Sequence, residues 1–197
     1  MRIQPKYLLL ISDAIIPLLG LFVWNWSLYF ILLFYLLDLT AREVLTHFKT
    51  REIYRVQGLK NTQKWQRNGI LSGVLFLAAV CTIHLAVWWM QPDINFWKEI
   101  VAFWKYEELG VQQGYILLPV IIYAAYAQYR MSFLMPGKAR TTLMDSLWKQ
   151  HFIALWLILV GSVLAAIIGT FVMLPDEVTV CAIVIAAAAY SYFLEKI

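Results

Sequence analysis

Long apolar runs separated by short charged stretches dominate the chain. Each run approaches or exceeds the roughly 18 to 20 residues that a helix needs to cross about 30 Å of hydrocarbon. The pattern predicts an all-α fold, a polytopic transmembrane helix bundle forming a single integral membrane domain over residues 1–197. Six spans are expected, at approximately 7–24, 27–46, 69–91, 115–135, 152–174 and 178–194.

Two longer segments connect these spans. Residues 47–68 are rich in Lys and Arg and predict a basic cytoplasmic loop. Residues 92–114 predict an amphipathic helix on the outer membrane face, starting near Pro92 and Asp93. Its apolar side would carry Phe96, Trp97, Ile100, Val101, Phe103 and Trp104. This segment can act as an anchor, as a lid over a cavity or as a docking surface.

Composition and charge support a membrane protein and set its orientation. The chain is 62% hydrophobic and 14% charged, whereas soluble domains are roughly 45 to 50% apolar and about 25% charged. With the N-terminus inside, all cations except Lys98 and Lys105 fall on the cytoplasmic side. This strong positive-inside bias predicts that both termini are cytoplasmic. The net charge of +4 therefore needs no nucleic acid to explain it.

Small residues recur at helical spacing and predict close helix packing. Gly69 and Gly73 share a face of the third span, and Gly161, Ala165 and Gly169 share a face of the fifth. The fifth and sixth spans are joined by a short turn and should form an antiparallel hairpin. The pattern leaves open whether these faces pack within one chain or between copies.

Ionisable residues inside the apolar runs are the candidate functional groups, because an unpaired charge at mid-membrane costs about 2.5 to more than 10 kcal/mol. Asp13, Asp38 and Arg130 lie at similar depths from the cytoplasmic side and predict a buried polar cluster, with Arg42 placed to form an i,i+4 pair with Asp38. Such a cluster can be an ion-paired structural element, or it can bind a proton, a cation or a polar substrate. His84 lies nearer the outer half and favours a hydrogen-bonded core histidine over a proton relay.

Signatures of catalysis and of bound cofactors are missing from the sequence. There is no Gly-rich phosphate loop, no grouped Cys and His ligands for a metal, and no nucleophile with a nearby His. Cys81 and Cys181 fall within spans, where a cysteine behaves as a small hydrophobe. The sequence therefore predicts no catalytic residues, no metal site and no cofactor.

The first forty residues resemble a known family. The segment Asp13-Ala14-Ile15-Ile16-Pro17-Leu18-Leu19-Gly20, followed by Trp26-Ser27 and Tyr35-Leu36-Leu37-Asp38, is similar to the opening hairpin of the DUF6498 family of prokaryotic multi-pass membrane proteins. Leu36 stands where that pattern has Trp, and Asp38 supplies its acidic residue. The resemblance implies a prokaryotic cytoplasmic membrane and draws attention to Asp38, but it implies no activity.

Three functions follow as hypotheses. In the first, the chain is an accessory or scaffolding subunit that holds a membrane protein partner or a second copy of itself in the bilayer. In the second, it is a small transporter or ion pathway that uses the buried carboxylates. In the third, it is a membrane-embedded enzyme. The few intramembrane polar groups favour the first hypothesis. The matched depth of the charges favours the second.

Overall fold

The computed structural model describes residues 15–59, 62–105, 107–108, 111–171 and 175–194. Within this part, a helical segment at residues 15–22 precedes the helices α2 (Leu28–Gln57), α3 (Thr62–Met90), α4 (Phe96–Lys105), α5 (Gln113–Tyr129), α6 (Met144–Phe171) and α7 (Asp176–Leu194). A π-helical turn, η1 (Arg130–Leu134), continues α5, and a 3-10 turn, η2 (Lys138–Arg140), precedes α6. The predicted all-α class is confirmed, apart from the two-residue strands β1 (Glu107–Glu108) and β2 (Val111–Gln112), which pair as a small hairpin.

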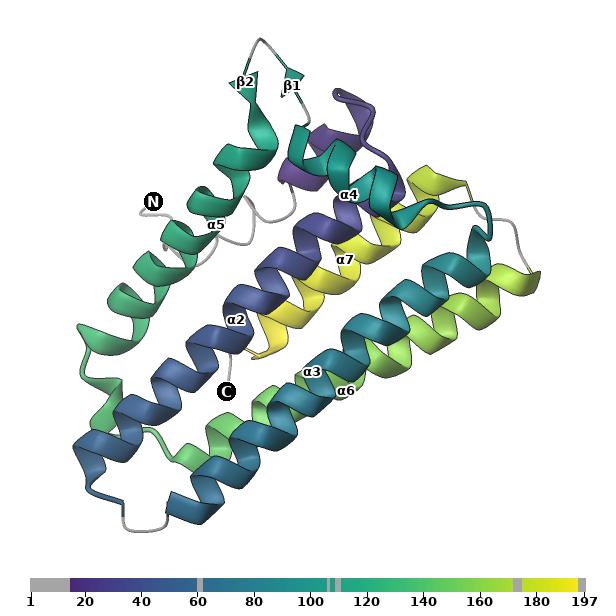
Figure 1. The fold of residues 1–197 in the computed structure, drawn as a ribbon. Helices are drawn as coiled ribbons and strands as arrows, with labels where there is room; N and C mark the ends of the chain where they lie inside the picture. Colours follow the sequence, from purple (N-terminus) through teal and green to yellow (C-terminus); the bar gives the residue numbers. More distant parts are fainter. Residues whose placement is uncertain (1–14, 60–61, 106, 109–110, 172–174, 195–197) are drawn as a thin grey trace.

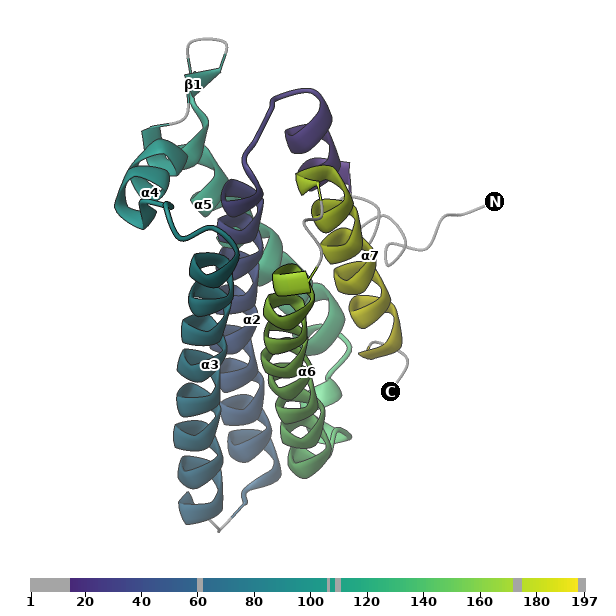
Figure 2. The same cartoon turned by 90° about the vertical axis from the view of Figure 1, so that its right-hand side faces the viewer.

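The helix α2 lies at the centre of the bundle. It contacts α3, α5, α6 and α7 along its length and α4 at one end (Figure 1). The most extensive packing joins α3 to α6, which run side by side in both views (Figure 2). One end of the bundle carries α4 and the small hairpin, and the opposite end carries the connections from α2 to α3 and from η1 to α6. The side chains between α2, α3 and α6 therefore come from three different parts of the sequence.

Local capping explains where α2 begins and ends. The Ser27 side chain accepts a hydrogen bond from the backbone N–H of Phe30 at 3.1 Å, which caps the first turn. Gly58 ends the helix in the left-handed conformation, with φ of 59°, and donates its N–H to the carbonyl of Tyr54. The predicted basic loop at 47–68 is therefore wrong for most of its length. The helix runs about 16 Å past the predicted span end at Thr46, because nothing in the sequence interrupts it before Gly58.

The segment 92–114 contains an amphipathic helix, α4, that is shorter than predicted. It begins at Phe96, since the Asn95 side chain accepts a hydrogen bond from the N–H of Lys98 at 3.0 Å and caps the helix there. Phe103 points into the bundle with 2% of its surface exposed, whereas Trp97 is 74% exposed. Part of the predicted apolar side therefore packs on α2 and α5, and part of it faces outward.

The predicted hairpin of the last two helices is wrong. In the described part of the chain, α7 packs against α2 and not along α6. Val180 and Val184 of α7 are buried in one hydrophobic cluster with Trp26, Leu28 and Ile31. These buried residues hold α7 against α2, whereas α6 lies against α3.

The predicted small-residue faces are only partly used within the chain. A Cβ on Gly69 would lie 3.3 Å from Cε1 of His47, and one on Gly169 would lie 2.8 Å from Cγ of Met90. These two glycines therefore allow close approach of α2 to α3 and of α3 to α6. By contrast, a Cβ on Gly73 or on Gly161 would meet nothing within 4 Å, and Ala165 is exposed.

Two helices, α3 and α6, are long and apolar enough to cross a membrane, in place of the six predicted spans. The first 18 residues of α2 contain Asp38, Arg42 and Glu43, and α5 is only 17 residues long before it changes to the π-helical turn. The described apolar part of α7 is shorter still, and residues 7–14 of the first predicted span lie outside the described residues.

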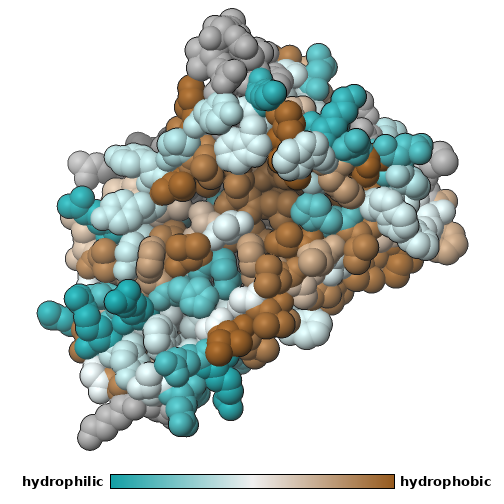
Figure 3. Space-filling model, viewed as in Figure 1, coloured by the Kyte–Doolittle hydropathy of each residue, from teal (hydrophilic) through white to brown (hydrophobic). Residues whose placement is uncertain are grey.

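The apolar surface of these two helices faces outward. Only 22% of the most apolar window of α3 and 11% of that of α6 is buried, whereas a core helix of a soluble protein would be mostly buried. Figure 3 shows hydrophobic residues across the middle of the molecule and hydrophilic residues gathered at the end where α2 leads to α3. We call this end the basic end. Its exposed cations are Arg51, Arg55, Arg67, Lys138, Arg140 and Lys149.

Candidate functional site

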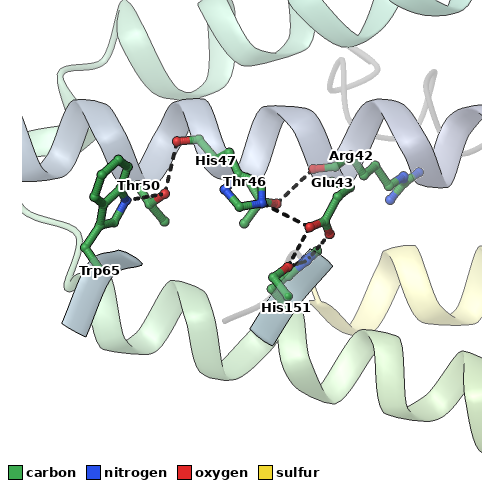
Figure 4. Close-up of polar contacts among 8 residues, drawn as sticks. Arg42, Glu43, Thr46, His47, Thr50, Trp65 and His151 are labelled. Atoms are coloured by element: carbon green, nitrogen blue, oxygen red, sulfur yellow. Dashed lines mark hydrogen bonds and ion pairs between the residues drawn. The ribbon is translucent and has the colours of Figure 1, made fainter. Parts of the chain in front are cut away.

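A polar face of α2 lies against α3 and α6. Glu43, His47 and Thr50 follow one another at spacings of four and three residues, which places them on one side of the helix. Ser72 of α3 contacts Glu43 from one neighbouring helix. His151 of α6 faces Glu43 from the other (Figure 4). We call Glu43, His47, Ser72 and His151 the Glu43 cluster.

Both oxygens of the Glu43 carboxylate have close partners. Oε2 lies 2.5 Å from Nε2 of His151, and Oε1 accepts the hydroxyl proton of Ser72 at 2.7 Å. Oε1 also lies 3.1 Å from Nε2 of His47. Glu43 is 7% exposed and Ser72 is fully buried, so the carboxylate is held by protein groups and not by bulk water.

The cluster carries an unbalanced charge when both imidazoles are neutral. An ionised Glu43 then contributes one negative charge in a site that is largely removed from water, and such a charge is costly unless a cation compensates it. A single proton shared between Glu43 and His151 neutralises it, and the two atoms, 2.5 Å apart, are within hydrogen-bond distance for such a proton. The arrangement can therefore hold one proton between the carboxylate and the imidazole.

The geometry does not match a serine hydrolase. In a catalytic triad the acid binds one imidazole nitrogen while the nucleophile binds the other. Here Glu43 and Ser72 both contact Nε2 of His151, at 2.5 and 2.9 Å. The serine therefore supports the carboxylate instead of being activated by the histidine.

The described residues also contain no group of three or more His, Cys, Asp or Glu side chains arranged to hold a metal ion. In the cluster, the two imidazoles and the serine hydroxyl already surround the carboxylate.

Polar contacts continue from the cluster towards the basic end. The Thr50 hydroxyl donates to the carbonyl of His47 at 3.0 Å and accepts from the indole N–H of Trp65 at 3.3 Å. The second of these hydrogen bonds connects α2 to the first turn of α3. His47 is the most accessible ionisable member of the cluster, with 37% of its side chain exposed, against 9% for Glu43 and 10% for His151.

The predicted Asp38–Arg42 pair is present, with Nε of Arg42 2.7 Å from Oδ2 of Asp38. The two side chains are 33% and 37% exposed, so the pair is at least partly accessible and lies apart from the Glu43 cluster. Asp13, the other predicted carboxylate, lies outside the described residues.

Arg130 is not brought to Asp38. Its neighbours Tyr129 and Phe133 pack against Ile53, which lies about 22 Å further along α2 than Asp38. Arg130 itself is exposed. The prediction of a shared depth assumed that α2 ends near Thr46. Because α2 continues to Gln57, the end of α5 meets a later part of it.

His84 forms the hydrogen bonds expected of a core histidine. Its Nδ1 lies 2.8 Å from the carbonyl oxygen of Val80, which can only accept, so this nitrogen carries a proton. In the neutral ring Nε2 then accepts from the hydroxyl of Tyr29 at 3.0 Å. This pair lies in the half of the bundle nearer α4 and is separate from the Glu43 cluster.

Sequence reasoning missed the central residues of the site. Glu43 lies inside the predicted span 27–46, where any carboxylate is a candidate, and a histidine follows it one helical turn later. These two facts were the available signal. His47 and His151 lie one residue outside the predicted spans 27–46 and 152–174. They were therefore not among the intramembrane groups whose depths predicted a polar cluster.

Comparison with protein-family models, with curated proteins and with solved structures finds no match for the chain. The resemblance of its first forty residues to the DUF6498 family stays a prediction. The function must therefore be argued from the site.

Proposed function

We propose that the chain is a polytopic integral membrane protein of the small-transporter class, whose exchangeable ligand is a proton held between Glu43 and His151. The observation that carries the proposal is the buried carboxylate, 2.5 Å from an imidazole nitrogen that is itself in a largely buried side chain. Ionisable groups within transmembrane bundles are costly and commonly mark proton relays or ion pathways.

Membrane insertion is supported by the outward-facing apolar surface of α3 and α6. Six crossings remain the proposal: α2, α5 and α7 pack beside these two helices in the bundle, and residues 15–22 belong to the first predicted span. The basic end would face the cytoplasm by the positive-inside rule, with α4 on the outer surface. The cytoplasmic membrane of a prokaryote is the location that the N-terminal resemblance implies.

The position of the site fits one state of an alternating-access cycle. Ser72 lies one turn inside the apolar part of α3, and His151 immediately precedes that of α6. Polar contacts lead from the cluster to the basic end through Thr50 and Trp65. A site that communicates with one side at a time is what alternating access requires.

Proton flux into liposomes tests the proposal. Purified full-length protein would be reconstituted with a trapped pH-sensitive dye, under an imposed pH gradient and membrane voltage. We expect Glu43→Gln to abolish the protein-dependent flux, because the amide cannot take up the proton. Asp38→Asn is the matched control, since it removes a carboxylate of the same helix outside the cluster, and it should keep wild-type flux. Wild-type protein that moves no protons, or Glu43→Gln that moves them normally, contradicts the proposal.

An accessory or scaffolding subunit is the second candidate. It is supported by the face of α6 around Gly161, where a Cβ would meet nothing within 4 Å and where Ala165 is exposed. A partner helix or a second copy could approach closely there. Mass spectrometry of protein extracted into nanodiscs at native expression level tests this candidate. A stoichiometric partner that is lost in Gly161→Leu supports it, and a protein that purifies alone as a monomer contradicts it.

A further inference from the structure

His47 differs from the other ionisable members of the Glu43 cluster in its exposure. Its Nε2 lies 3.1 Å from Oε1 of Glu43, while 37% of its side chain is accessible, against 9% for Glu43 and 10% for His151. It also lies one turn closer to the basic end of α2 than Glu43 does. Among these three side chains, it best combines contact with the buried carboxylate and access to solvent.

Two uncharged residues, Gly69 and Trp148, pack against the His47 ring. Gly69 of α3 leaves room for the ring, since a Cβ there would lie 3.3 Å from Cε1 and 3.6 Å from Nδ1. Trp148 of α6 meets the ring edge to face at 5.6 Å between centroids. Neither residue is ionisable, so Glu43 is the ionisable group in direct contact with the ring, and His151 faces the opposite oxygen of that carboxylate.

The other ring nitrogen is available for exchange. In the described part of the chain, Nδ1 of His47 makes no hydrogen bond to protein. The indole N–H of Trp148, whose ring contacts both His47 and His151, also has no acceptor among the described residues. Buried donors are seldom left unpaired in proteins, so this donor independently marks a place for a polar ligand such as water beside the ring.

From this geometry we infer that His47 is the exchange residue that carries protons between Glu43 and water at the basic end. This inference rests on the proposed function. In the release step the proton shared with His151 stays on the carboxyl group of Glu43, and rotation of that group presents its O–H to His47. This O–H bond breaks, an N–H bond forms at Nε2 of His47, Nδ1 releases its own proton to water at the basic end, and Glu43 is left ionised. One proton enters the ring and one leaves it, so no further reactant is needed. Rotation of the ring or proton exchange with water restores the starting tautomer.

The liposome assay tests this role with His47→Gln, whose amide retains a hydrogen bond to Glu43 but cannot pass a proton on. We expect the flux to fall at least about tenfold, as when a positioned acid–base group is removed. Imidazole buffer on the side of the basic end should restore much of the lost flux, because it replaces the missing ring. Glu43→Gln should lose flux and gain nothing from imidazole.

A pair of glycine variants provides the second arm and does not alter the ring itself. Gly69→Ala places a methyl group against His47, and Gly73→Ala, one turn away on α3, meets nothing within 4 Å. Gly69→Ala should slow the flux and Gly73→Ala should not. If His47→Gln does not fold, as judged by gel filtration, this pair decides the question.

The outcomes separate the two proposals. Normal flux in His47→Gln together with lost flux in Glu43→Gln overturns the exchange role and leaves the proton site standing. Loss of flux in His47→Gln without rescue by imidazole also overturns the exchange role, because the residue is then only structural. Normal flux in Glu43→Gln overturns the proposed function itself.

Discussion

Removing the imidazole of His151 is the sharpest test of how the bundle holds a buried carboxylate. In His151→Ala, Glu43 loses its partner at 2.5 Å, and its side chain is only 9% exposed when that partner is present. Breaking a buried charged pair by removing one partner costs about 3–5 kcal/mol in soluble proteins. Glu43 can avoid being a buried, unpaired charge by taking up a proton. At pH 7 this protonation costs about 3.7 kcal/mol for a carboxyl group with an ordinary pKa of about 4.3. We therefore expect a loss of about 3 kcal/mol in the free energy of unfolding.

The Asp38–Arg42 pair supplies the comparison. It has a similar separation, 2.7 Å, but its side chains are 33% and 37% exposed. Exposed pairs of this kind contribute about 0.2–1 kcal/mol, so Asp38→Asn should cost no more than about a third of the His151→Ala loss. Ser72→Ala should cost at most about 1.7 kcal/mol, the largest value measured for hydrogen bonds between membrane helices, and so less than His151→Ala.

A double-mutant cycle isolates the electrostatic part. Glu43→Gln removes the charge, so adding His151→Ala to it should cost only the lost packing, about 1 kcal/mol. The coupling between the two sites would then be about 2 kcal/mol. The assay is reversible unfolding in mixed micelles with increasing denaturing detergent, followed by far-ultraviolet circular dichroism. Equal losses in His151→Ala and Asp38→Asn, or a cycle without coupling, would refute the reasoning.

Two further predictions concern packing at opposite ends of α2. A Cβ on Gly20 would lie 2.1 Å from the ring of Trp26. Gly20→Ala should therefore destabilise the protein by about 1–3 kcal/mol in the same unfolding assay. Gly161→Ala is the control and should be nearly neutral, because a Cβ there would meet nothing within 4 Å. Gln57 donates from Nε2 to the carbonyls of Ala139 and Thr142, both at 2.9 Å, so Gln57→Ala should cost about 1 kcal/mol and speed proteolysis between η1 and α6. Unchanged proteolysis would show that these bonds do not hold that connection.

Much of the fold could be predicted because the length and apolar character of a long helix can be read directly from the sequence. Apolar runs located α3, α5 and α6, and the local pairing of Asp38 with Arg42 followed from helical spacing alone. Helix ends were less predictable. A helix can continue into water once its apolar face ends, so the true end of α2 was set by Gly58 and not by hydropathy.

The candidate site required the tertiary structure. The sequence by itself determined that the chain is helical, that its cations are grouped in a few segments between apolar runs and that a few ionisable groups lie within those runs. It did not determine which helices are neighbours, because apolar faces of similar composition can pack in many ways in lipid. Only the packing of α2 against α3 and α6 brought Glu43 to Ser72 and His151, residues 29 and 108 positions away along the chain. Buried polar groups then decide the arrangement, since few packings satisfy both oxygens of one carboxylate.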